Sequence, residues 1–561
     1  MRQCRAKERA IHAFANVGWD SSTIPSQWCH RSCSGARRRD FFSEVGGPNV
    51  FTFLVAFKAC SMARELELGR RIHDDAAGIG DLSSNFVATA AVDMYSSCGS
   101  MAEARRIFES LANPDVALWN SLVMGYARNR DSRLALEFFF AMDREANARS
   151  YVAGLTACSG MAGEEQGQEI DRKEIKVMSL EKGMEIHSRA VKGGHLGEIF
   201  VQNSLVDMYG KCGSVLDART VFDRMMHHDV ISWNSLMVGS VESGEIDLAL
   251  DLFDWIHRSC ELLINPRVYV TALTACSRKA MKEERKVGGL VKIESLERSM
   301  EVHCLASGKN SCDQLDLFVG NTLVEAYSKC SSMLDARRAF DRMKDHDAVS
   351  WTSLILGYTD NNEAELALEI FSAMAAQGVC KLHSGTFVAA LTACSSLERV
   401  QEFHSRFLEA GCYDNAGAVV ENSLIDAYSR CGRTVEAKSV FDSIESPTVV
   451  SWNALMLGYE ENGESQLALD LFQMMIRQRL CSPNAKTLVA ALTACARLGA
   501  AEESSREKAA LLQTGVSIQR EAERLFYDSD VSVTRALEIM YAKCGEAREI
   551  FLGDDGDGSH R

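Results

Sequence analysis

Apolar residues recur along this chain at the spacing of one face of a helix. In the segment LVDMYGKCGSVLDARTVFD (205–223), Leu205, Met208, Tyr209 and Cys212 fall at positions i, i+3, i+4 and i+7. Side chains with this spacing lie on the same side of an α-helix. The segment therefore predicts an amphipathic helix that buries one stripe.

A second helix is predicted directly after the first. Gly213 can adopt the left-handed conformation that ends a helix, and the apolar residues Ala218, Val221 and Phe222 then restart the same spacing. In three copies a serine before this second helix is followed three positions later by an acid, which predicts a capping box. These pairs are Ser100/Glu103, Ser214/Asp217 and Ser332/Asp335. Each segment is thus predicted to be a helical hairpin.

The hairpin pattern belongs to a long internal repeat. Copies of the first phrase occupy 91–109, 205–223, 323–341 and 424–442, and each is followed by a tryptophan-containing phrase and then by one such as YVTALTACS (269–277). A hairpin of roughly 31 to 36 residues cannot bury both apolar stripes alone, so neighbouring hairpins must stack. The predicted fold class is all-α, an α-solenoid of stacked two-helix repeats.

Composition agrees with a large folded chain. The 561 residues are 46% hydrophobic and include 6 prolines, which leaves ample material for a core and little for linkers. No apolar run is long enough to span a bilayer, so no membrane segment is expected.

The 19 cysteines do not predict disulfides or a metal site. Most of those in the repeats occupy the same helical positions from copy to copy, where free cysteine packs as a small apolar residue. They are Cys60, Cys98, Cys158, Cys212, Cys276, Cys330, Cys394, Cys431, Cys495 and Cys544. Cys29, His30 and Cys33 lie close together but lack a second pair at zinc-site spacing. No metal and no cofactor are therefore expected.

The net charge of -16 argues against a protein that coats nucleic acid without selectivity, because such affinity comes mainly from Lys and Arg on phosphates. A solenoid can still carry acids on one face and a binding row on the other, and 61 Lys and Arg residues remain for a local stripe.

Three phrases carry a family resemblance. DMYGKCGSVLDARTVFD, DVISWNSLMVG and YVTALTACS resemble the S, P and L repeats of pentatricopeptide repeat proteins, in the variable-length PLS subclass found chiefly in plant organelles. They recur in fixed order over roughly residues 50 to 551. The resemblance implies a right-handed superhelix that binds single-stranded RNA, one base per repeat. In the family, the fifth residue of the first helix and the last residue of the repeat recognise the base.

Carried onto this chain, the resemblance implies eight base-recognition pairs. In the S-type repeats they are Thr89/Asp115, Asn203/Asp229, Asn321/Asp347 and Asn422/Thr448, and in the P-type repeats Asn120/Asn147, Asn234/Asn265, Thr352/His383 and Asn453/Asn484. An amide offers a donor and an acceptor together, which suits contact with a base edge. A competing prediction is a polar residue near a helix start that makes a local backbone bond.

The family's preferences assign bases to part of the row. Asn with Asp favours U, Asn with Asn favours C over U, and Thr with Asp favours G. Thr352/His383 and Asn422/Thr448 depart from the usual pairs, and the repeat of Asn120/Asn147 is short. The L-type repeats carry aliphatic residues at the fifth position, which predicts a spacing role. These residues are Leu54, Val152, Val270, Val388 and Val489.

Two L-type repeats are enlarged by charged segments, 163–176 and 282–294. An exposed loop between the helices is the main prediction, and a partner-docking loop is the alternative. A histidine also recurs at one place in the second helix of the L-type repeats, which indicates packing rather than catalysis. The four copies are His73, His187, His303 and His404.

No catalytic motif is found, so no enzyme is expected. The zinc deaminase motifs H-x-E and P-C-x-x-C are missing, as are a phosphate loop and a nucleophile elbow. Many members of the subclass end in a deaminase-like domain, whereas here the last S-type repeat is shortened in YAKCGEAREIF (541–551) and Arg535 replaces the expected Asn.

Four regions are predicted along the chain. Residues 1–49 hold a transit segment or a degenerate first repeat, since eight Lys and Arg face two acids within 1–39. Tandem repeats follow over 50–530, a truncated S-type repeat over 531–551, and an acidic disordered tail over 552–561.

The expected function is sequence-specific binding of single-stranded RNA in organellar RNA metabolism, namely editing-site recognition, processing or stabilisation. The organelle implied is a mitochondrion or chloroplast, with the mitochondrion slightly favoured. Any catalyst, such as a deaminase or another RNA-processing factor, would act in trans. Two alternatives stay open: a protein-binding scaffold of the tetratricopeptide kind, and a truncated remnant of a C-to-U editing factor.

Overall fold

The computed structural model describes residues 50–79, 84–142, 146–170, 173–259, 264–283, 292–308, 316–377, 384–394, 396–410, 417–478, 481–502, 504–528 and 530–544. The predictions made for 1–49, for the Cys29/Cys33 pair, for 545–561 and for most of the second charged segment lie outside these residues. The chain divides into two compact parts, Met1–Lys279 and Ala280–Arg561, and each is described by itself.

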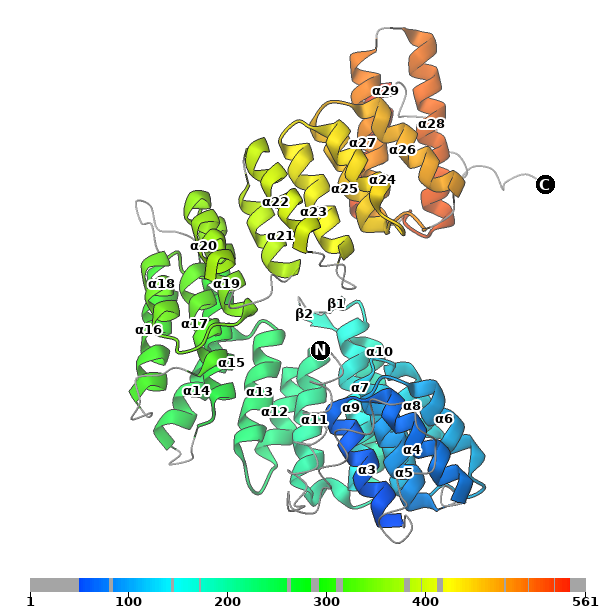
Figure 1. The fold of residues 1–561 in the computed structure, drawn as a ribbon, viewed down its shortest axis with the longest axis vertical. Coiled ribbons are helices and arrows are strands. Elements are labelled where there is room, and N and C mark those ends of the chain that lie inside the picture. The colour runs from blue at the N-terminus through cyan, green and yellow to red at the C-terminus, as the bar shows by residue number, and fades with distance from the viewer. Residues whose placement is uncertain are drawn as a thin grey trace, which may run out of the picture. The chain divides into compact units, whose positions relative to one another are not determined.

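The N-terminal part is a row of helical hairpins (Figure 1). Its helices are α3 (Val50–Ala63), α4 (Leu66–Ile79), α5 (Asn85–Ser97), α6 (Met101–Ser110), α7 (Val116–Arg128), α8 (Ser132–Ala141), α9 (Ala148–Glu164), α10 (Val177–Lys192), η2 (His195–Gly197), α11 (Ile199–Lys211), α12 (Val215–Asp223), α13 (Val230–Glu242), α14 (Ile246–Ser259) and most of α15 (Pro266–Lys282). The first helix of each hairpin packs against its own second helix, and the first helices α3, α5, α7, α9, α11 and α13 pack against one another in chain order.

The C-terminal part repeats this arrangement. Its helices are α16 (Ile293–Gly308), α17 (Leu317–Lys329), α18 (Met333–Asp341), α19 (Ala348–Asp360), α20 (Ala364–Gln377), α21 (Ser384–Ala393), α22 (Leu397–Ala410), α23 (Gly417–Arg430), α24 (Thr434–Ser443), α25 (Val449–Glu461), α26 (Ser465–Gln478), α27 (Ala485–Ala501), α28 (Ser505–Arg524) and α29 (Val531–Cys544). From α17 onward each first helix again contacts the next one, up to α27 with α29. The predicted all-α solenoid of stacked hairpins is confirmed.

The core runs between the first helices and is built from the predicted stripes. Leu205, Met208 and Tyr209 of α11 are all buried. Helices α11 and α13 approach closely where two glycines meet: a Cβ built on Gly239 of α13 would lie 2.7 Å from the Cα of Gly210 on α11. Side chains at this crossing would push the two helices apart, so glycine permits the close packing.

The recurring histidine links the second helix of its own hairpin to the first helix of the next hairpin. In each copy a ring Nδ1 lies within hydrogen-bond distance of the hydroxyl of the marker tyrosine, at 2.8 to 2.9 Å. The pairs are His73/Tyr95, His187/Tyr209, His303/Tyr327 and His404/Tyr428. In the last hairpin Gln519 replaces the histidine and accepts from Tyr541. The predicted packing role is therefore confirmed.

The capping boxes predicted at the second helices are wrong. Ser100 is the N-cap of α6, but its hydroxyl donates to Glu103 (2.5 Å) and accepts no bond from a helix N–H. Ser214 is the N-cap of α12, and its hydroxyl likewise donates to Asp217 (2.6 Å) without capping the helix. The acid attracts the hydroxyl proton more strongly than a helix N–H attracts the hydroxyl oxygen. True capping boxes occur instead at the first helices, where Asp229 accepts from Ser232 N and Ser232 accepts from Asp229 N.

The first charged segment forms strands in place of the expected plain loop. β1 (Gln168–Ile170) and β2 (Lys173–Ile175) pair antiparallel, with Gln168 opposite Ile175. The hairpin is tied to the repeats because the N–H of Lys176 donates to the carbonyl of Cys212 (3.0 Å). Glu165 also caps α10 by accepting from the N–H of Ser179 (2.9 Å).

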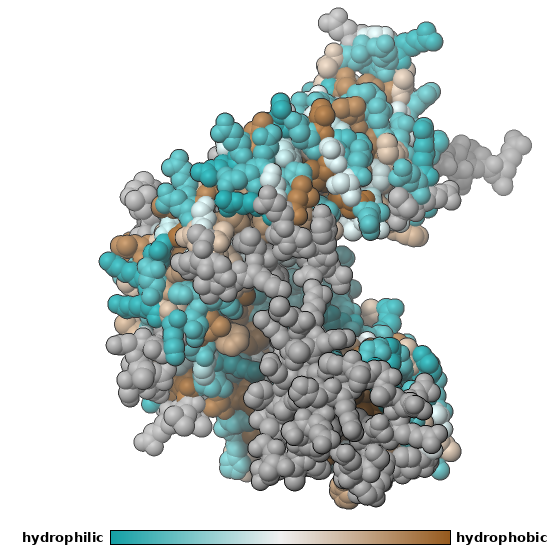
Figure 2. Space-filling view, in the orientation of Figure 1, coloured by the Kyte–Doolittle hydropathy of each residue, from teal (hydrophilic) through white to brown (hydrophobic). Residues whose placement is uncertain are grey.

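Hydrophilic side chains cover much of the visible face of the described residues, with smaller apolar areas between them (Figure 2). Among the helices that are described, none is long and apolar enough to cross a membrane.

Candidate functional site

In seven of the eight predicted pairs, the second base-recognition residue is also the N-cap of the following first helix. Asp229 and Asp347 cap α13 and α19, each accepting from the backbone N–H three residues later. The same position is held by Asp115 before α7, Asn147 before α9, Thr448 before α25 and Asn484 before α27. Asn265 likewise accepts from Val268 N (3.2 Å). The fold thus fixes the orientation of these side chains.

Four of the eight predicted pairs are joined by a direct hydrogen bond. In each, the Nδ2 of the fifth-position asparagine donates to the side-chain oxygen of the N-cap residue. The pairs are Asn120/Asn147 (3.1 Å), Asn203/Asp229 (3.2 Å), Asn321/Asp347 (3.3 Å) and Asn453/Asn484 (3.1 Å). The amide orientation follows from this network. The two positions assigned by resemblance are therefore neighbours in space, although they lie 26 to 31 residues apart in the sequence.

The other four predicted pairs are not joined in this way within the described residues. The hydroxyls of Thr89 and Thr352 donate to the carbonyls of Asn85 and Ala348, four residues earlier. The competing prediction of a local backbone bond thus describes Thr89. Thr352 makes such a bond and also lies 2.9 Å from the hydroxyl of Thr386, on the first helix of the next repeat. The competing prediction does not describe the four asparagines that bond to the N-cap of the next repeat.

Asn234 and Asn422 have other surroundings. The Oδ1 of Asn234 accepts from Thr271 (2.9 Å), and no bond to Asn265 is found in the described part of the chain. The Oδ1 of Asn422 is buried and has no hydrogen-bond partner among the described residues. His383 lies outside the described residues, so the pair Thr352/His383 stays a prediction.

Hydrogen bonds keep the capping carboxylates ionised. Partial burial raises the pKa of Asp229, but the N–H and hydroxyl of Ser232 and the amide of Asn203 outweigh it, so the pKa lies below its ordinary value. The pKa of Asp347 is lowered in the same way by Ser350 and Asn321, against the effect of burial. Both residues therefore carry a negative charge at neutral pH.

The two kinds of pair leave different groups free. In Asn321/Asp347 the Oδ1 of Asp347 accepts from Asn321, from Ser350 N and from the Ser350 hydroxyl, which leaves the second carboxylate oxygen available as an acceptor. In Asn453/Asn484 the Oδ1 of Asn484 takes the equivalent three bonds, and its Nδ2 remains available as a donor. In Asn203/Asp229 the second carboxylate oxygen also accepts from Asn203, at 3.4 Å, and it retains a lone pair for a ligand. An Asp pair therefore presents an acceptor, and an Asn pair presents a donor.

A row of exposed apolar side chains accompanies the pairs. Its members stand three positions before the fifth residue of each repeat, and so on the same helical face. Seven members precede a residue of a predicted pair, and they are Phe86, Phe200, Ile231, Phe318, Val349, Val419 and Val450. Phe51 holds the same place before Leu54 of an L-type repeat. Phe200 and Phe318 are 66% and 71% exposed. This row was not predicted from the sequence, although an apolar residue recurs three positions before each Asn or Thr of the pairs and could have revealed it.

In three L-type repeats the equivalent second residue is basic and exposed. These residues are Arg149, Arg267 and Lys486, which precede the aliphatic residues Val152, Val270 and Val489. Three L-type repeats thus carry a cation at this position, whereas the S- and P-type repeats of the predicted pairs carry an apolar residue.

Models of two repeat families match the chain. The model described as "PPR repeat" matches residues 117–145, 203–230, 231–254, 321–347, 349–379 and 422–446, and the one described as "PPR repeat family" matches 447–497. The chain belongs to the pentatricopeptide repeat family.

Similar pentatricopeptide repeat proteins are found along most of the chain. One chloroplastic pentatricopeptide repeat-containing protein of Arabidopsis thaliana is 32% identical over 528 residues, covering 92% of this chain and 59% of its own length. A second chloroplastic one is 30% identical, covering 89% of this chain and 48% of its own length. A mitochondrial one is 29% identical over 87% of this chain and 44% of its own length. The chain therefore spans about half the length of the curated relatives it matches.

Among solved structures, the maize pentatricopeptide repeat protein PPR10 is similar at 16% identity and a TM-score of 0.39, covering 94% of this chain and 79% of its own. PPR10 in complex with an 18-nt psaJ RNA element is similar at 17% identity and a TM-score of 0.45, covering 89% and 77%.

Proposed function

We propose that this pentatricopeptide repeat protein binds single-stranded RNA with sequence selectivity and has no catalytic activity of its own. The observation that carries the proposal is the set of asparagine and N-cap pairs, each held by a hydrogen bond between adjacent repeats. Such pairs present fixed polar groups at regular intervals, as recognition of successive bases requires.

The free groups of each pair match different bases. The ionised carboxylate of Asp229 or Asp347 can accept the N3–H of uracil, which cytosine lacks. The free amide of Asn147 or Asn484 can donate to the N3 of cytosine. This chemistry supports the family's preferences, in which an Asn/Asp pair selects U and an Asn/Asn pair selects C. Each repeat would then bind one base.

The exposed apolar row supplies the second half of the interaction. Phe86, Phe200 and Phe318 stand on the face of the fifth residues and offer flat surfaces to the faces of the bases. Stacking of a base on an aromatic side chain contributes roughly 1 to 3 kcal/mol. Arg149, Arg267 and Lys486 would contact phosphates, which reconciles RNA binding with a net charge of -16.

The names of the relatives indicate a cellular compartment. Those compared are named chloroplastic or mitochondrial, and we propose an organellar site of action in one of these two compartments. The order of S, P and L repeats supports the PLS subclass and a role in editing-site recognition, processing or stabilisation. A deaminase or another processing factor would then be recruited in trans.

Selection from a random single-stranded RNA pool tests the proposal. The wild-type protein is expected to enrich a motif with U at the positions of Asn203 and Asn321. The variants Asn203→Thr and Asn321→Thr should move each position from U towards G, while the rest of the motif stays constant as an internal control. A pool without any enriched motif would favour the protein-binding scaffold and exclude base recognition.

A further inference from the structure

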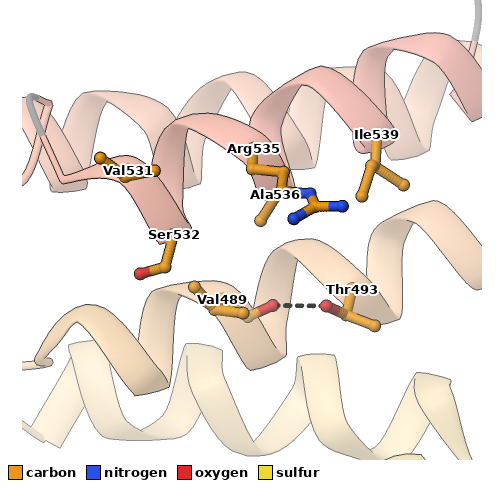
Figure 3. Close-up of a pocket in the computed structure, with 7 residues that line it drawn as sticks. All are labelled: Val489, Thr493, Val531, Ser532, Arg535, Ala536 and Ile539. Carbon is orange, nitrogen blue, oxygen red and sulfur yellow. Dashed lines mark hydrogen bonds between the residues drawn. The ribbon is translucent and has the colours of Figure 1, made fainter.

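A pocket lies between α27 and α29, which are the first helices of the last two described repeats (Figure 3). Its volume is about 520 Å³, and it is lined by Val489, Thr493, Val531, Ser532, Arg535, Ala536 and Ile539. Four of these residues are aliphatic, and the one charged group is the guanidinium of Arg535. In the close-up the Arg535 guanidinium lies on the side of α29 that faces the pocket, near Ala536 and Ile539.

The pocket continues the face that carries the proposed recognition pairs. Val489 is the fifth residue of α27, and Arg535 is the fifth residue of α29. Ser532 is the second residue of α29, where other repeats carry a large apolar side chain. Arg535 therefore occupies the place held by Asn203 and Asn321 in the earlier S-type repeats.

The polar groups beside Arg535 are already engaged. The hydroxyl of Thr493 donates to the carbonyl of Val489 (2.8 Å), and the hydroxyl of Ser532 donates to Asp530. By contrast, the Arg535 guanidinium makes no ion pair or hydrogen bond with any residue in the described part of the chain, and its side chain is exposed. It therefore has up to five N–H donors available for a ligand.

We infer that this pocket binds a guanine base, the nucleotide immediately 3′ of the one that faces the repeat of Val489. The inference rests on the proposed RNA-binding function and extends its row by one position. A guanidinium donates two parallel hydrogen bonds to the O6 and N7 of guanine, whereas adenine places an amino group where O6 would be. The aliphatic walls of Val489 and Ile539 suit the flat face of a base.

The pocket's chemistry favours a base over a bare phosphate. A phosphate is strongly hydrated, and placing it against Val489, Val531 and Ile539 would remove water without replacing its hydrogen bonds. A base has an apolar face for these walls and a polar edge for Arg535. The purine also offers a larger apolar face than a pyrimidine.

The test measures binding of the full chain to RNAs that share the selected motif and differ only at this 3′ nucleotide. Guanine is expected to bind about tenfold more tightly than adenine, and 7-deazaguanine, which lacks N7, should lose most of that advantage. Arg535→Met should remove the preference for guanine. Lys543→Met is the matched control, because it removes an exposed cation from α29 outside the pocket and should preserve the preference.

The outcomes separate the guanine inference from the proposed function. If the motif is enriched but all four bases bind equally at this nucleotide, or if cytosine binds best, the guanine inference is overturned and RNA binding stands. Equal weakening of every RNA by Arg535→Met would show a phosphate contact and would also overturn it. If no RNA motif is enriched at all, both proposals fail together.

Discussion

The side-chain amide of Asn203 donates to the carboxylate of Asp229, the residue that caps the first helix of the next repeat. One carboxylate thus orients the proposed recognition residue and stabilises α13. Replacing Asp229 by alanine would remove both contributions, and loss of an N-cap alone costs about 1 kcal/mol. A clean test of recognition must therefore change the second carboxylate oxygen of Asp229, which makes only a long bond to Asn203 (3.4 Å), while keeping the cap.

Asp229→Asn meets this requirement and should change the preferred base. Asparagine caps helices as well as aspartate does, and its Oδ1 can still accept from Ser232 and Asn203. Its Nδ2 replaces the second carboxylate oxygen and gives up the long bond to Asn203, so an acceptor becomes a donor. We expect the facing nucleotide to change from U to C, by about tenfold in relative affinity, given the usual value of such contacts. Binding of two RNAs that differ only at this nucleotide measures the effect.

Asp131→Asn provides the matched control. Asp131 caps α8, a second helix, by accepting from Leu134 N (3.3 Å). The same chemical change there alters net charge equally but should leave base preference untouched. If both variants changed the motif alike, total charge rather than the pair at Asp229 would determine the preference.

The exposed aromatic row gives a prediction about affinity rather than selectivity. Phe200→Ser should lower RNA affinity by roughly 1 to 3 kcal/mol, because one base loses its stacking surface. Phe200 is 66% exposed, so the thermal midpoint should change little. Leu216→Ser removes a comparably exposed apolar side chain from the second helix α12 and should leave affinity unchanged. Filter binding and circular dichroism melts of both variants test this. If the two variants bound RNA with equal affinity, the exposed apolar row would have no role in RNA binding.

Periodicity predicted the hairpins well because burial of one stripe dominates the energetics of each helix. The stripe through Leu205 and Tyr209 is buried as expected. The β1–β2 hairpin was not predicted, because short charged strands carry no apolar alternation that distinguishes them from a loop. The cap at Ser100 was misassigned, because the sequence does not tell whether a hydroxyl donates to a nearby acid or accepts from the helix.

The site was predicted in part. Family resemblance selected Asn203 and Asp229, and the structure places them in contact. The exposure of Phe200 was not predicted, because in the sequence an apolar residue next to a buried stripe cannot be distinguished from a member of that stripe. Whether such a residue is covered depends on how the neighbouring repeat packs, which spacing alone does not specify.

Acid should destabilise the repeats through the recurring histidines. Burial lowers the pKa of His187, with Arg224 adding to the effect and Asp217 opposing it. The unfolded chain therefore takes up a proton at a higher pH than the folded chain does. Stability is fully present above the unfolded pKa, near 6.5, and falls as the pH drops through that value.

A fourfold variant should flatten this pH dependence. It replaces His73, His187, His303 and His404 by glutamine, as the chain itself does at Gln519, which bonds to Tyr541. Melting midpoints at pH 7.5 and 5.5 should differ less in the variant than in the wild type. His227→Gln, which changes an exposed histidine, should retain the wild-type difference. An unchanged slope in the fourfold variant would assign acid sensitivity to other groups.

The close crossing of α11 and α13 gives a prediction about stability. A Cβ at Gly239 would lie 2.7 Å from the Cα of Gly210, a backbone atom that cannot move without shifting α11. Gly239→Ala should therefore destabilise the fold by about 1 to 3 kcal/mol, the usual cost of overpacking, despite alanine's better helix propensity. Gly163→Ala in α9 meets nothing within 4 Å, so it should be neutral or stabilising by up to about 1 kcal/mol. Denaturation midpoints of the two variants separate the effects, and a stable Gly239→Ala protein would mean that α11 and α13 can separate without loss of the core.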